Sequence, residues 1–194
     1  MRIIGGTARG RKLFTPPLHE KSIRPTSDRA REALFNIIGN QVVDANVLDL
    51  FAGTGALGLE AFSRNARFVV FIDNNHLALQ LIKKNILHCL KGNSGDCEMR
   101  VVRHDLSNSI PLNKLPREVH AGFDLIFADP PYAKNMSSSI LEFVNNSSLL
   151  THNGLLVVEE RYNVEMPLCL QKLKLTDRRL YGDTAFYFYR SSDE

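Results

Sequence analysis

A short motif suited to chemistry on an amine, Asp129-Pro130-Pro131-Tyr132, follows an apolar run. The exocyclic amine of guanine or adenine is a poor nucleophile, because its lone pair is delocalised into the ring. The Asp129 carboxylate and the Pro130 carbonyl could accept both N–H bonds and turn the lone pair toward a methyl group, while the prolines fix the backbone. Tyr132 could stack on the base, which is worth about 1–3 kcal/mol. The motif predicts a catalytic site for methylation of a base amine.

A glycine-rich segment, residues 53–58, reads Gly-Thr-Gly-Ala-Leu-Gly between an apolar run and an amphipathic one. This spacing between a strand and a helix predicts a nucleoside-binding turn, and Asp73 at the end of the next apolar run predicts an acceptor for ribose hydroxyls. A pyrophosphate would be repelled by the nearby Asp49 carboxylate, whereas the sulfonium and ammonium groups of S-adenosylmethionine would be attracted to it. The segment therefore favours S-adenosylmethionine as the cofactor.

A third acidic position, Asp105, follows the apolar run near residues 101–102. It could accept a hydrogen bond from the adenine amino group of the same ligand, or it could cap a loop, and the sequence leaves both interpretations open. With their neighbours, these positions form the predicted cofactor site: Asp49, Phe51, Ala52, Gly53, Thr54, Gly55, Asp73, Asn74, Asp105 and Leu106.

Metal, disulfide and thiolate chemistry are not expected. The six histidines show no metal-ligand spacing, and the three cysteines (Cys89, Cys97 and Cys169) include no Cys-x-x-Cys pair. No cysteine follows a proline, which argues against the Pro-Cys thiolate used to methylate a pyrimidine carbon. No apolar run approaches the roughly 18 to 20 residues that span a bilayer. We expect a cytoplasmic protein with reduced thiols, no metal and no membrane contact.

Apolar runs alternate with amphipathic stretches from residue 46 onward, which predicts an α/β fold with a mainly parallel sheet. Strands are expected at 47–51, 68–72, 99–102, 123–128 and 155–159, and helices around 57–62, 77–87 and 140–144. Two more strand-like stretches, 173–180 and 184–189, flank a tight-turn signal at 181–183. The pattern indicates a seven-stranded, mostly parallel sheet with one antiparallel strand and helices on both faces.

The N-terminal 40 residues lie outside this pattern and are basic. Residues 1–32 hold eight of the 24 Lys and Arg residues but only three of the 21 acidic ones. A helix is expected over residues 27–38, with a cap at Thr26 or Ser27 and Gly39 at its end. We predict a basic extension over residues 1–40, containing a hairpin and this helix, ahead of a methyltransferase domain over residues 41–194.

This charge asymmetry is typical of proteins that dock on phosphates, and a solvated terminus with an excess of arginine explains it equally well. In the expected helix, Arg29 and Arg31 can stay exposed while the apolar positions pack. Pro25 suggests a rigid placement of Arg24 near the active site. The candidate RNA contacts are Arg9, Arg11, Lys12, Arg24, Arg29 and Arg31.

Several blocks of the sequence resemble the bacterial 16S ribosomal RNA guanine-N2 methyltransferase family of the RsmD type. They are residues 1–6, 8–11, 24–26, 28–35, 49–61, 129–132 and 181–184, so the resemblance covers essentially the whole chain. It implies a class I S-adenosylmethionine-dependent methyltransferase fold and methylation of one guanine N2 in 16S rRNA. The implied partner is the small ribosomal subunit or its assembly intermediate. Asn65 stands where the family usually has glycine, and asparagine tolerates the left-handed conformation that a helix end often needs.

Three alternatives remain at this point. A DNA adenine-N6 methyltransferase shares the tetrapeptide and the glycine loop, although 194 residues leave little room for a separate target-recognition segment. A protein glutamine methyltransferase uses similar chemistry, although it more often has asparagine where Asp129 stands. A non-catalytic RNA-binding assembly factor with a vestigial donor site would explain the basic extension without catalysis.

Overall fold

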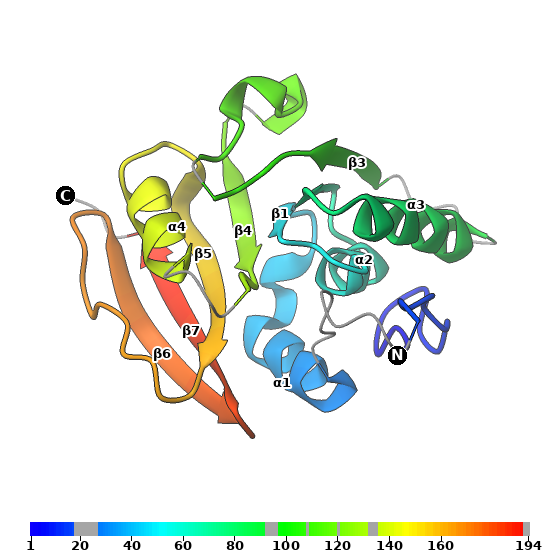
Figure 1. The fold of residues 1–194 in the computed structure, drawn as a ribbon, viewed down its shortest axis with the longest axis horizontal. Coiled ribbons are helices and arrows are strands. Elements are labelled where there is room, and N and C mark those ends of the chain that lie inside the picture. Colours follow the sequence, from blue (N-terminus) through cyan, green and yellow to red (C-terminus); the bar gives the residue numbers. More distant parts are fainter. Residues whose placement is uncertain (18–26, 92–96, 108, 120, 132–135, 192–194) are drawn as a thin grey trace.

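Seven strands form one twisted sheet in the order β3-β2-β1-β4-β5-β7-β6 (Figure 1). The computed structural model describes residues 1–17, 27–91, 97–107, 109–119, 121–131 and 136–191. β7 runs antiparallel to its neighbours β5 and β6, and the other pairs are parallel, which confirms the expected mostly parallel sheet. The strands are β1 (Asn46–Leu50), β2 (Phe68–Asp73), β3 (Glu98–Arg103), β4 (Phe123–Ala128), β5 (Leu150–Arg161), β6 (Leu173–Tyr181) and β7 (Thr184–Ser191).

Helices cover both faces of the sheet, as predicted. The α-helices are α1 (Asp28–Ile38), α2 (Ala56–Ser63), α3 (His76–Leu90) and α4 (Met136–Asn145), and three short 3-10 helices are η1 (Gly39–Val42), η2 (Leu112–Lys114) and η3 (Arg117–Val119). One core packs α1, α2 and α3 against side chains such as Val47 of β1, and the other packs α4 against side chains such as Leu48. β1 is buried along its whole length because parallel strands with helices on both faces bury both sets of side chains.

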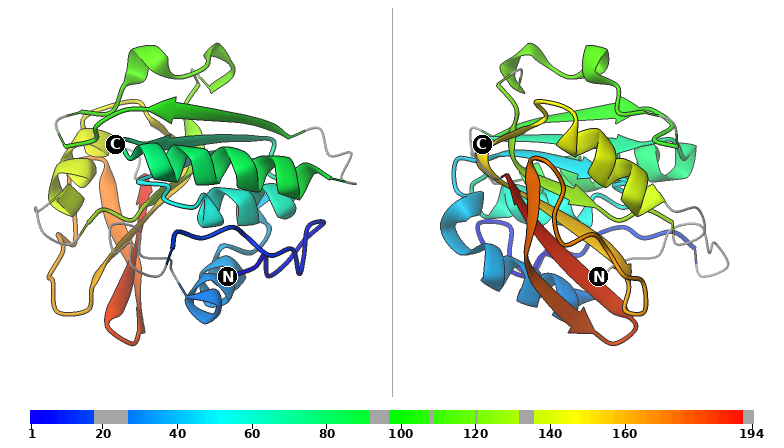
Figure 2. Two further views of the ribbon diagram at one scale, coloured as in Figure 1. Left: turned by 45° about the vertical axis from the view of Figure 1, so that its right-hand side comes forward. Right: turned by 90° about the vertical axis from the view of Figure 1, so that its left-hand side faces the viewer.

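Residues 1–17 pack beside α1 and α2 on the same face of the sheet (Figure 2). Arg2 and Lys12 pair in an antiparallel bridge, and Ile3 N–H donates to the Arg11 carbonyl at 2.9 Å, so the segment folds back on itself as a small hairpin. Ile3 and Leu13 are buried in the core that α1, α2 and α3 share. The N-terminal segment thus shares a core with the sheet, and the division of the chain at residue 40 stays a prediction.

Close backbone contact between the hairpin and α2 requires a glycine at position 6. Gly6 has φ +73°, and a Cβ atom there would lie 1.6 Å from the Ser63 carbonyl oxygen. Thr7 N–H donates to that same oxygen at 2.7 Å, and Ala8 N–H donates to Ser63 Oγ at 2.8 Å. A side chain at position 6 would push the hairpin away from α2 and break these hydrogen bonds. The hairpin therefore packs on α2 through its backbone.

The helix at the end of the N-terminal region has the expected boundaries. Ser27 caps α1 by accepting from Ala30 N–H, which confirms one of the two predicted caps. Gly39 follows the last turn with φ +58°, as a helix-ending glycine often does. α1 packs on the face of the sheet, and the centroid of the Phe35 ring lies 5.6 Å from the centroid of the Phe127 ring on β4.

A buried ion pair holds α1, α2 and the hairpin together. Glu60 of α2 is fully buried and accepts from the N–H groups of Ile4 and Gly5, both at 2.8 Å. Arg31 of α1 is also fully buried, and its Nε lies 3.6 Å from Glu60 Oε2. The expectation that Arg31 is exposed was therefore wrong, because the position faces α2 and its guanidinium is paired with Glu60 and Asp28.

All three cysteines are free thiols. Within the part of the chain that the structure describes, no three His, Cys, Asp or Glu side chains lie close enough together to hold a metal ion. None of the helices among the described residues is both long and apolar enough to cross a bilayer.

Candidate active site

The glycine loop and the catalytic motif begin next to each other at the carboxyl edge of the sheet. Leu50, the last residue of β1, pairs with Ala128, the last residue of β4. Strand order reverses between β1 and β4, and in open α/β sheets the crevice at such a reversal binds the ligand. The fold therefore brings together the two motifs that the sequence identified separately.

The turn that follows β1 and leads into the glycine loop, residues 51–55, has a left-handed backbone at three of its five positions. Phe51 has φ +57°, Gly53 +55° and Gly55 +77°. A non-glycine residue in this region costs free energy on the order of 1–3 kcal/mol and persists only where its surroundings hold it, often at functional sites. Here Ala52 N–H donates to the Ile72 carbonyl at 3.1 Å, which fixes the turn to β2.

The third glycine of the motif permits close packing of α2 on the sheet. A Cβ atom at Gly58 would lie 2.3 Å from a ring carbon of Phe71 and 2.9 Å from Val69 Cγ1. α2 begins directly after the loop, so its position on β2 sets the direction in which the loop N–H groups point. The G-x-G-x-x-G spacing is explained by this packing as well as by the turn.

Asp73 at the end of β2 holds the loop from one side. Its Oδ2 accepts from Gly53 N–H at 2.8 Å, and its Oδ1 accepts from Asn75 N–H at 2.8 Å. The carboxylate is half-buried, and Asn74 beside it is exposed. Each oxygen keeps a further lone pair, so the predicted contact of Asp73 with ribose hydroxyls is compatible with these bonds and stays a prediction.

Asp49 lies within β1 and is buried. Its Oδ2 accepts from Gly58 N–H at 2.9 Å, so the carboxylate binds the start of α2. Burial raises the pKa of Asp49 from 3.8 to about 8; the Gly58 hydrogen bond lowers it and the Asp73 charge raises it. A cation bound nearby would stabilise the charged form of Asp49 and lower this pKa again, which agrees with the charge argument for S-adenosylmethionine.

Asp129 begins the catalytic motif in an acidic environment. Burial, followed by the charges of Glu159, Asp49 and Glu160, raises its pKa well above the usual value. Pro130 is buried and Pro131 is exposed, whereas Tyr132 lies outside the described residues. The structure thus places the carboxylate of the motif at the carboxyl edge with a raised pKa, as acid–base groups in active sites often have.

Two acids that the sequence reasoning missed, Glu159 and Glu160, lie on β5 beside the motif. Both are buried, and β5 pairs with β4 up to Ala128 and Val158, which puts Glu159 level with Asp129 and Glu160 one residue further along. Glu160 Oε2 accepts from Ser137 Oγ at 2.6 Å and so ties the start of α4 to the sheet. Two adjacent glutamates at the end of the apolar run 155–158 were the signal available in the sequence.

The acceptor predicted for adenine, Asp105, caps a loop in the structure. Asp105 is exposed, and its Oδ1 accepts from Ser107 N–H at 3.0 Å, which is the loop-capping geometry. Leu106 is buried on the face that α4 covers. Capping leaves other lone pairs on the Asp105 carboxylate, so a role in adenine binding stays a prediction.

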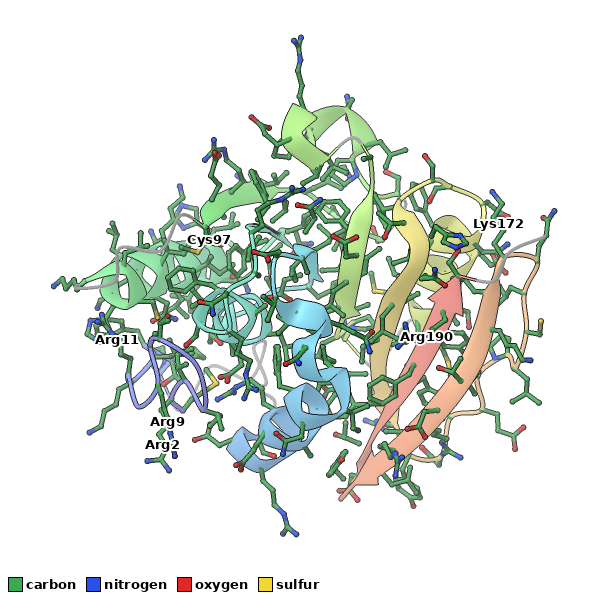
Figure 3. All side chains as sticks on the ribbon, turned by 180° about the vertical axis from the view of Figure 1, so that it is seen from behind. Arg2, Arg9, Arg11, Cys97, Lys172 and Arg190 are labelled. Carbon is green, nitrogen blue, oxygen red and sulfur yellow. The ribbon has the colours of Figure 1, made fainter. Side chains whose placement is uncertain are left out.

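The candidate RNA contacts divide into exposed and engaged side chains. Arg9, Lys12 and Arg29 are exposed. Figure 3 shows Arg2, Arg9 and Arg11 together at one end of the molecule, far from Arg190 on β7. Arg24 lies outside the described residues.

Two of these candidates are engaged within the protein. Arg11 Nη1 and Nη2 donate to the carbonyls of His88 and Lys91, so this guanidinium caps the end of α3. Arg31 is buried against Glu60, so the phosphate contact predicted for it is wrong. Among the described residues, Arg9, Lys12 and Arg29 therefore remain the candidate RNA contacts.

Basic side chains of α3 extend the exposed surface of the hairpin, which the sequence reasoning missed. Lys84 Nζ lies 3.8 Å from the centre of the Phe14 ring, and the His88 ring meets Phe14 edge-on at 5.5 Å. Phe14 is 38% exposed. A partly exposed aromatic ring beside a lysine is a feature of nucleic-acid-binding surfaces.

The raised pKa of Asp49 makes a prediction about stability. Between pH 3.8 and about 8 the folded protein binds this proton more tightly than the unfolded chain, so the free energy of unfolding should fall as pH rises through that window. Asp49 alone contributes at most about 1.4 kcal/mol per pH unit. In Asp49→Asn, whose amide oxygen can still accept from Gly58, the slope should flatten, and urea unfolding across the window measures it. Equal slopes in the two proteins would contradict the assignment.

The sequence matches the model of the family described as conserved hypothetical protein 95 over residues 1–190. Ribosomal RNA small subunit methyltransferase D of Escherichia coli (strain K12) is 33% identical over 190 residues, which cover 98% of this chain and 89% of that protein. The Haemophilus influenzae protein of the same name is 37% identical over 159 residues, 82% of this chain and 78% of that one. The structure of the Escherichia coli protein yhhF has a TM-score of 0.80 at 31% identity and covers 100% of this chain and 99% of that one.

Proposed function

The chain belongs to the family described as conserved hypothetical protein 95, and we propose that it methylates the exocyclic N2 amine of a guanine in 16S rRNA with S-adenosylmethionine as donor. The match over nearly the full length to ribosomal RNA small subunit methyltransferase D confirms the RsmD-type family that the sequence blocks indicated. Methylation of small-subunit rRNA is thus the activity of the family. The choice of guanine N2 over another base amine rests on the resemblance to the RsmD type, and the chemistry of the site supports methylation of an exocyclic amine.

The observation that carries this function is the position of Asp129 beside the glycine loop, among buried acids. The pairing of Leu50 with Ala128 makes the loop and the motif neighbours, so a donor on the loop and an amine at Asp129 would meet. Glu159, Asp49 and Glu160 raise the pKa of Asp129, and a bound cation would relieve the repulsion among these carboxyl groups. A sulfonium donor fits this set of residues better than an anionic dinucleotide does.

S-adenosylmethionine, when bound, supplies an electrophilic methyl group that is transferred by displacement at carbon. The residues of the chain bind and orient the two reactants, which is where proximity catalysis gains its rate. The Asp129 carboxylate and the Pro130 carbonyl hold the amine hydrogens and direct the nitrogen lone pair. As the new N–C bond forms, one N–H proton must leave, and a carboxylate with a raised pKa beside that nitrogen is a matched acceptor.

The substrate side is supported by the exposed cations of the hairpin and α1. Arg9, Lys12 and Arg29 can meet phosphates, and Lys84 beside Phe14 extends this surface along α3. The target base must lie in a single-stranded region or be turned out of its stack to reach the carboxyl edge. We propose the small ribosomal subunit or its assembly intermediate as the partner, which would place the protein in the cytoplasm.

The function is tested with small ribosomal subunits from cells that lack the protein. The purified full-length chain is incubated with these subunits, or with deproteinised 16S rRNA, and with methyl-labelled S-adenosylmethionine. Mass spectrometry of the digested RNA should show labelled N2-methylguanosine at one site, with more label on the subunit than on free RNA. Labelled 6-methyladenosine, or no labelled nucleoside in either RNA, would overturn the proposal.

The hairpin cations make a prediction about salt dependence. Each phosphate contact contributes roughly 0.7 to 0.9 to the slope of log affinity against log salt. Arg9→Ala combined with Lys12→Ala should therefore lower the slope by about 1.4 to 1.8 and leave donor affinity unchanged. Adding Arg11→Ala should not lower it further, because that guanidinium caps α3.

Filter binding of the RNA over a salt series measures this slope. The matched control is Lys172→Ala with Lys174→Ala, two exposed lysines at the start of the edge strand β6, where the slope should equal that of the wild type. A wild-type slope in the hairpin double variant would contradict the proposed phosphate contacts, and the hairpin cations would then be solvated surface charges.

A further inference from the structure

Asn85 of α3 joins three segments that are far apart in the sequence. Its side chain is fully buried, and its Oδ1 accepts from Phe14 N–H at 2.7 Å. Its Nδ2 donates to the Phe14 carbonyl at 3.0 Å and to the Thr54 carbonyl at 2.9 Å. One amide thus binds the backbone of the N-terminal segment and the backbone of the glycine loop.

The chemistry of the three partners admits only a carboxamide. Two of them are carbonyl oxygens and need N–H donors, and the third is an N–H group that needs an acceptor. These partners also determine which end of the amide is oxygen and which is nitrogen. Aspartate would place a carboxylate against two carbonyls, and leucine, with a similar volume, would satisfy none of the three.

The contact of Asn85 with Thr54 lies within the glycine loop. Thr54 is buried between Gly53 and Gly55, both of which have positive φ angles. Asp73 holds Gly53 N–H from the end of β2, and Asn85 holds the next carbonyl from α3. The loop is therefore anchored from two directions at adjacent residues, and Asn85 carries the second anchor.

We propose that Asn85 is a positioning residue of the donor site, which holds the glycine loop in its binding conformation and links it to the N-terminal segment. The proposal rests on the function proposed above, because it assumes that this loop binds S-adenosylmethionine. Phe14 is two residues from Lys12 and stacks with Lys84, so the same clamp lies beneath the basic surface. Loss of the clamp loosens the loop and weakens donor binding, while the amine site at Asp129 keeps its own supports.

The test measures binding of S-adenosylhomocysteine to full-length variants by calorimetry, with kinetics alongside. Asn85→Asp and Asn85→Leu should each weaken its binding by about tenfold or more, which corresponds to the loss of one or two net hydrogen bonds. The KM for S-adenosylmethionine should rise to a similar extent, while kcat stays within about threefold, because Asn85 does not touch the reacting atoms.

The matched control is Asn145→Leu. Asn145 is also buried at a helix, its Oδ1 accepts from the distant Lys172 N–H at 2.8 Å, and its Nδ2 donates to the neighbouring Asn146 rather than to the glycine loop. The Asn145→Leu variant should lower the melting temperature about as much as the Asn85 variants do, and its affinity for S-adenosylhomocysteine should stay within about twofold of the wild type. Folded Asn85 variants that bind within twofold of the wild type would overturn the proposal.

A measurement on the wild type keeps the proposal testable if both Asn85 variants fail to fold. Adding S-adenosylhomocysteine should slow amide hydrogen exchange at Phe14 together with the loop amides, because the clamp joins them. Slowed exchange at the loop with unchanged exchange at Phe14 would overturn the link. Binding of S-adenosylhomocysteine to the wild type is the separate test of the proposed function, so the two failures are distinguishable.

Discussion

Replacing Asp129 by alanine is expected to lower kcat by about 10²- to 10⁴-fold, the usual range for loss of a positioned acid–base group. In the proposed mechanism the Asp129 carboxylate directs the amine and takes its proton, and both roles develop as the new bond forms. Donor affinity should stay within a few-fold, because the loop is anchored by Asp73 and Asn85 rather than by Asp129. Single-turnover methylation of small subunits, with calorimetry for the donor, measures the two effects separately.

Asp129→Asn provides the control for this prediction. An amide oxygen still accepts one N–H bond but cannot take the proton, so turnover should lie between that of the alanine variant and that of the wild type. In the wild type, kcat should increase with pH as Asp129 loses its proton, because its pKa is raised, and this increase should be absent in Asp129→Asn. Wild-type rates in both variants would reduce the motif to a structural turn.

Replacing Glu60 by alanine is expected to lower the free energy of unfolding by about 3 to 5 kcal/mol. The change leaves the buried Arg31 guanidinium without its Glu60 partner, and it removes the acceptor of Ile4 N–H and Gly5 N–H. Breaking one side of a buried pair costs more than the pair contributes, because the remaining charge stays desolvated. Urea unfolding followed by circular dichroism measures the loss.

Two variants calibrate the Glu60 result. Glu60→Gln keeps an oxygen acceptor and should lose less stability than the alanine variant. Asp177→Ala removes an exposed pair with Arg179, 2.8 Å apart, and should cost less than about 1 kcal/mol. A Glu60→Ala protein no less stable than Asp177→Ala would show that the pair does not hold α1 to α2.

Local sequence patterns determined the elements and the place of the chemistry. Apolar and strand-like runs predicted all seven strands, although β5 begins at Leu150, five residues before the predicted start, and Gly39 marked the end of α1. The glycine loop and residues 129–131 were placed at strand ends because each motif directly follows its strand. These features depend on side-chain periodicity and turn chemistry, which act over a few residues and are therefore legible in one sequence.

Tertiary structure alone decided what the polar side chains do. Arg31 belongs to a basic stretch, yet α2 covers it, and Arg11 turns to the end of α3 instead of to solvent. Glu159 raises the pKa of Asp129 only because β5 pairs with β4 and brings the two side chains together. A charged residue reads as exposed in a local pattern, since burial of a charge requires a partner that the pattern does not contain.

Asn85 shows the physical reason most directly. Helical spacing puts Asn85 on the same buried side of α3 as Leu81 and Cys89, but it does not reveal the partners of the Asn85 amide. Thr54 is 31 residues away in the sequence and Phe14 is 71 residues away. Such contacts form only when the sheet brings α3, the glycine loop and the N-terminal segment together. The sequence by itself determined where the glycine loop and the Asp129 motif begin, and the tertiary structure decided which side chains hold them in place.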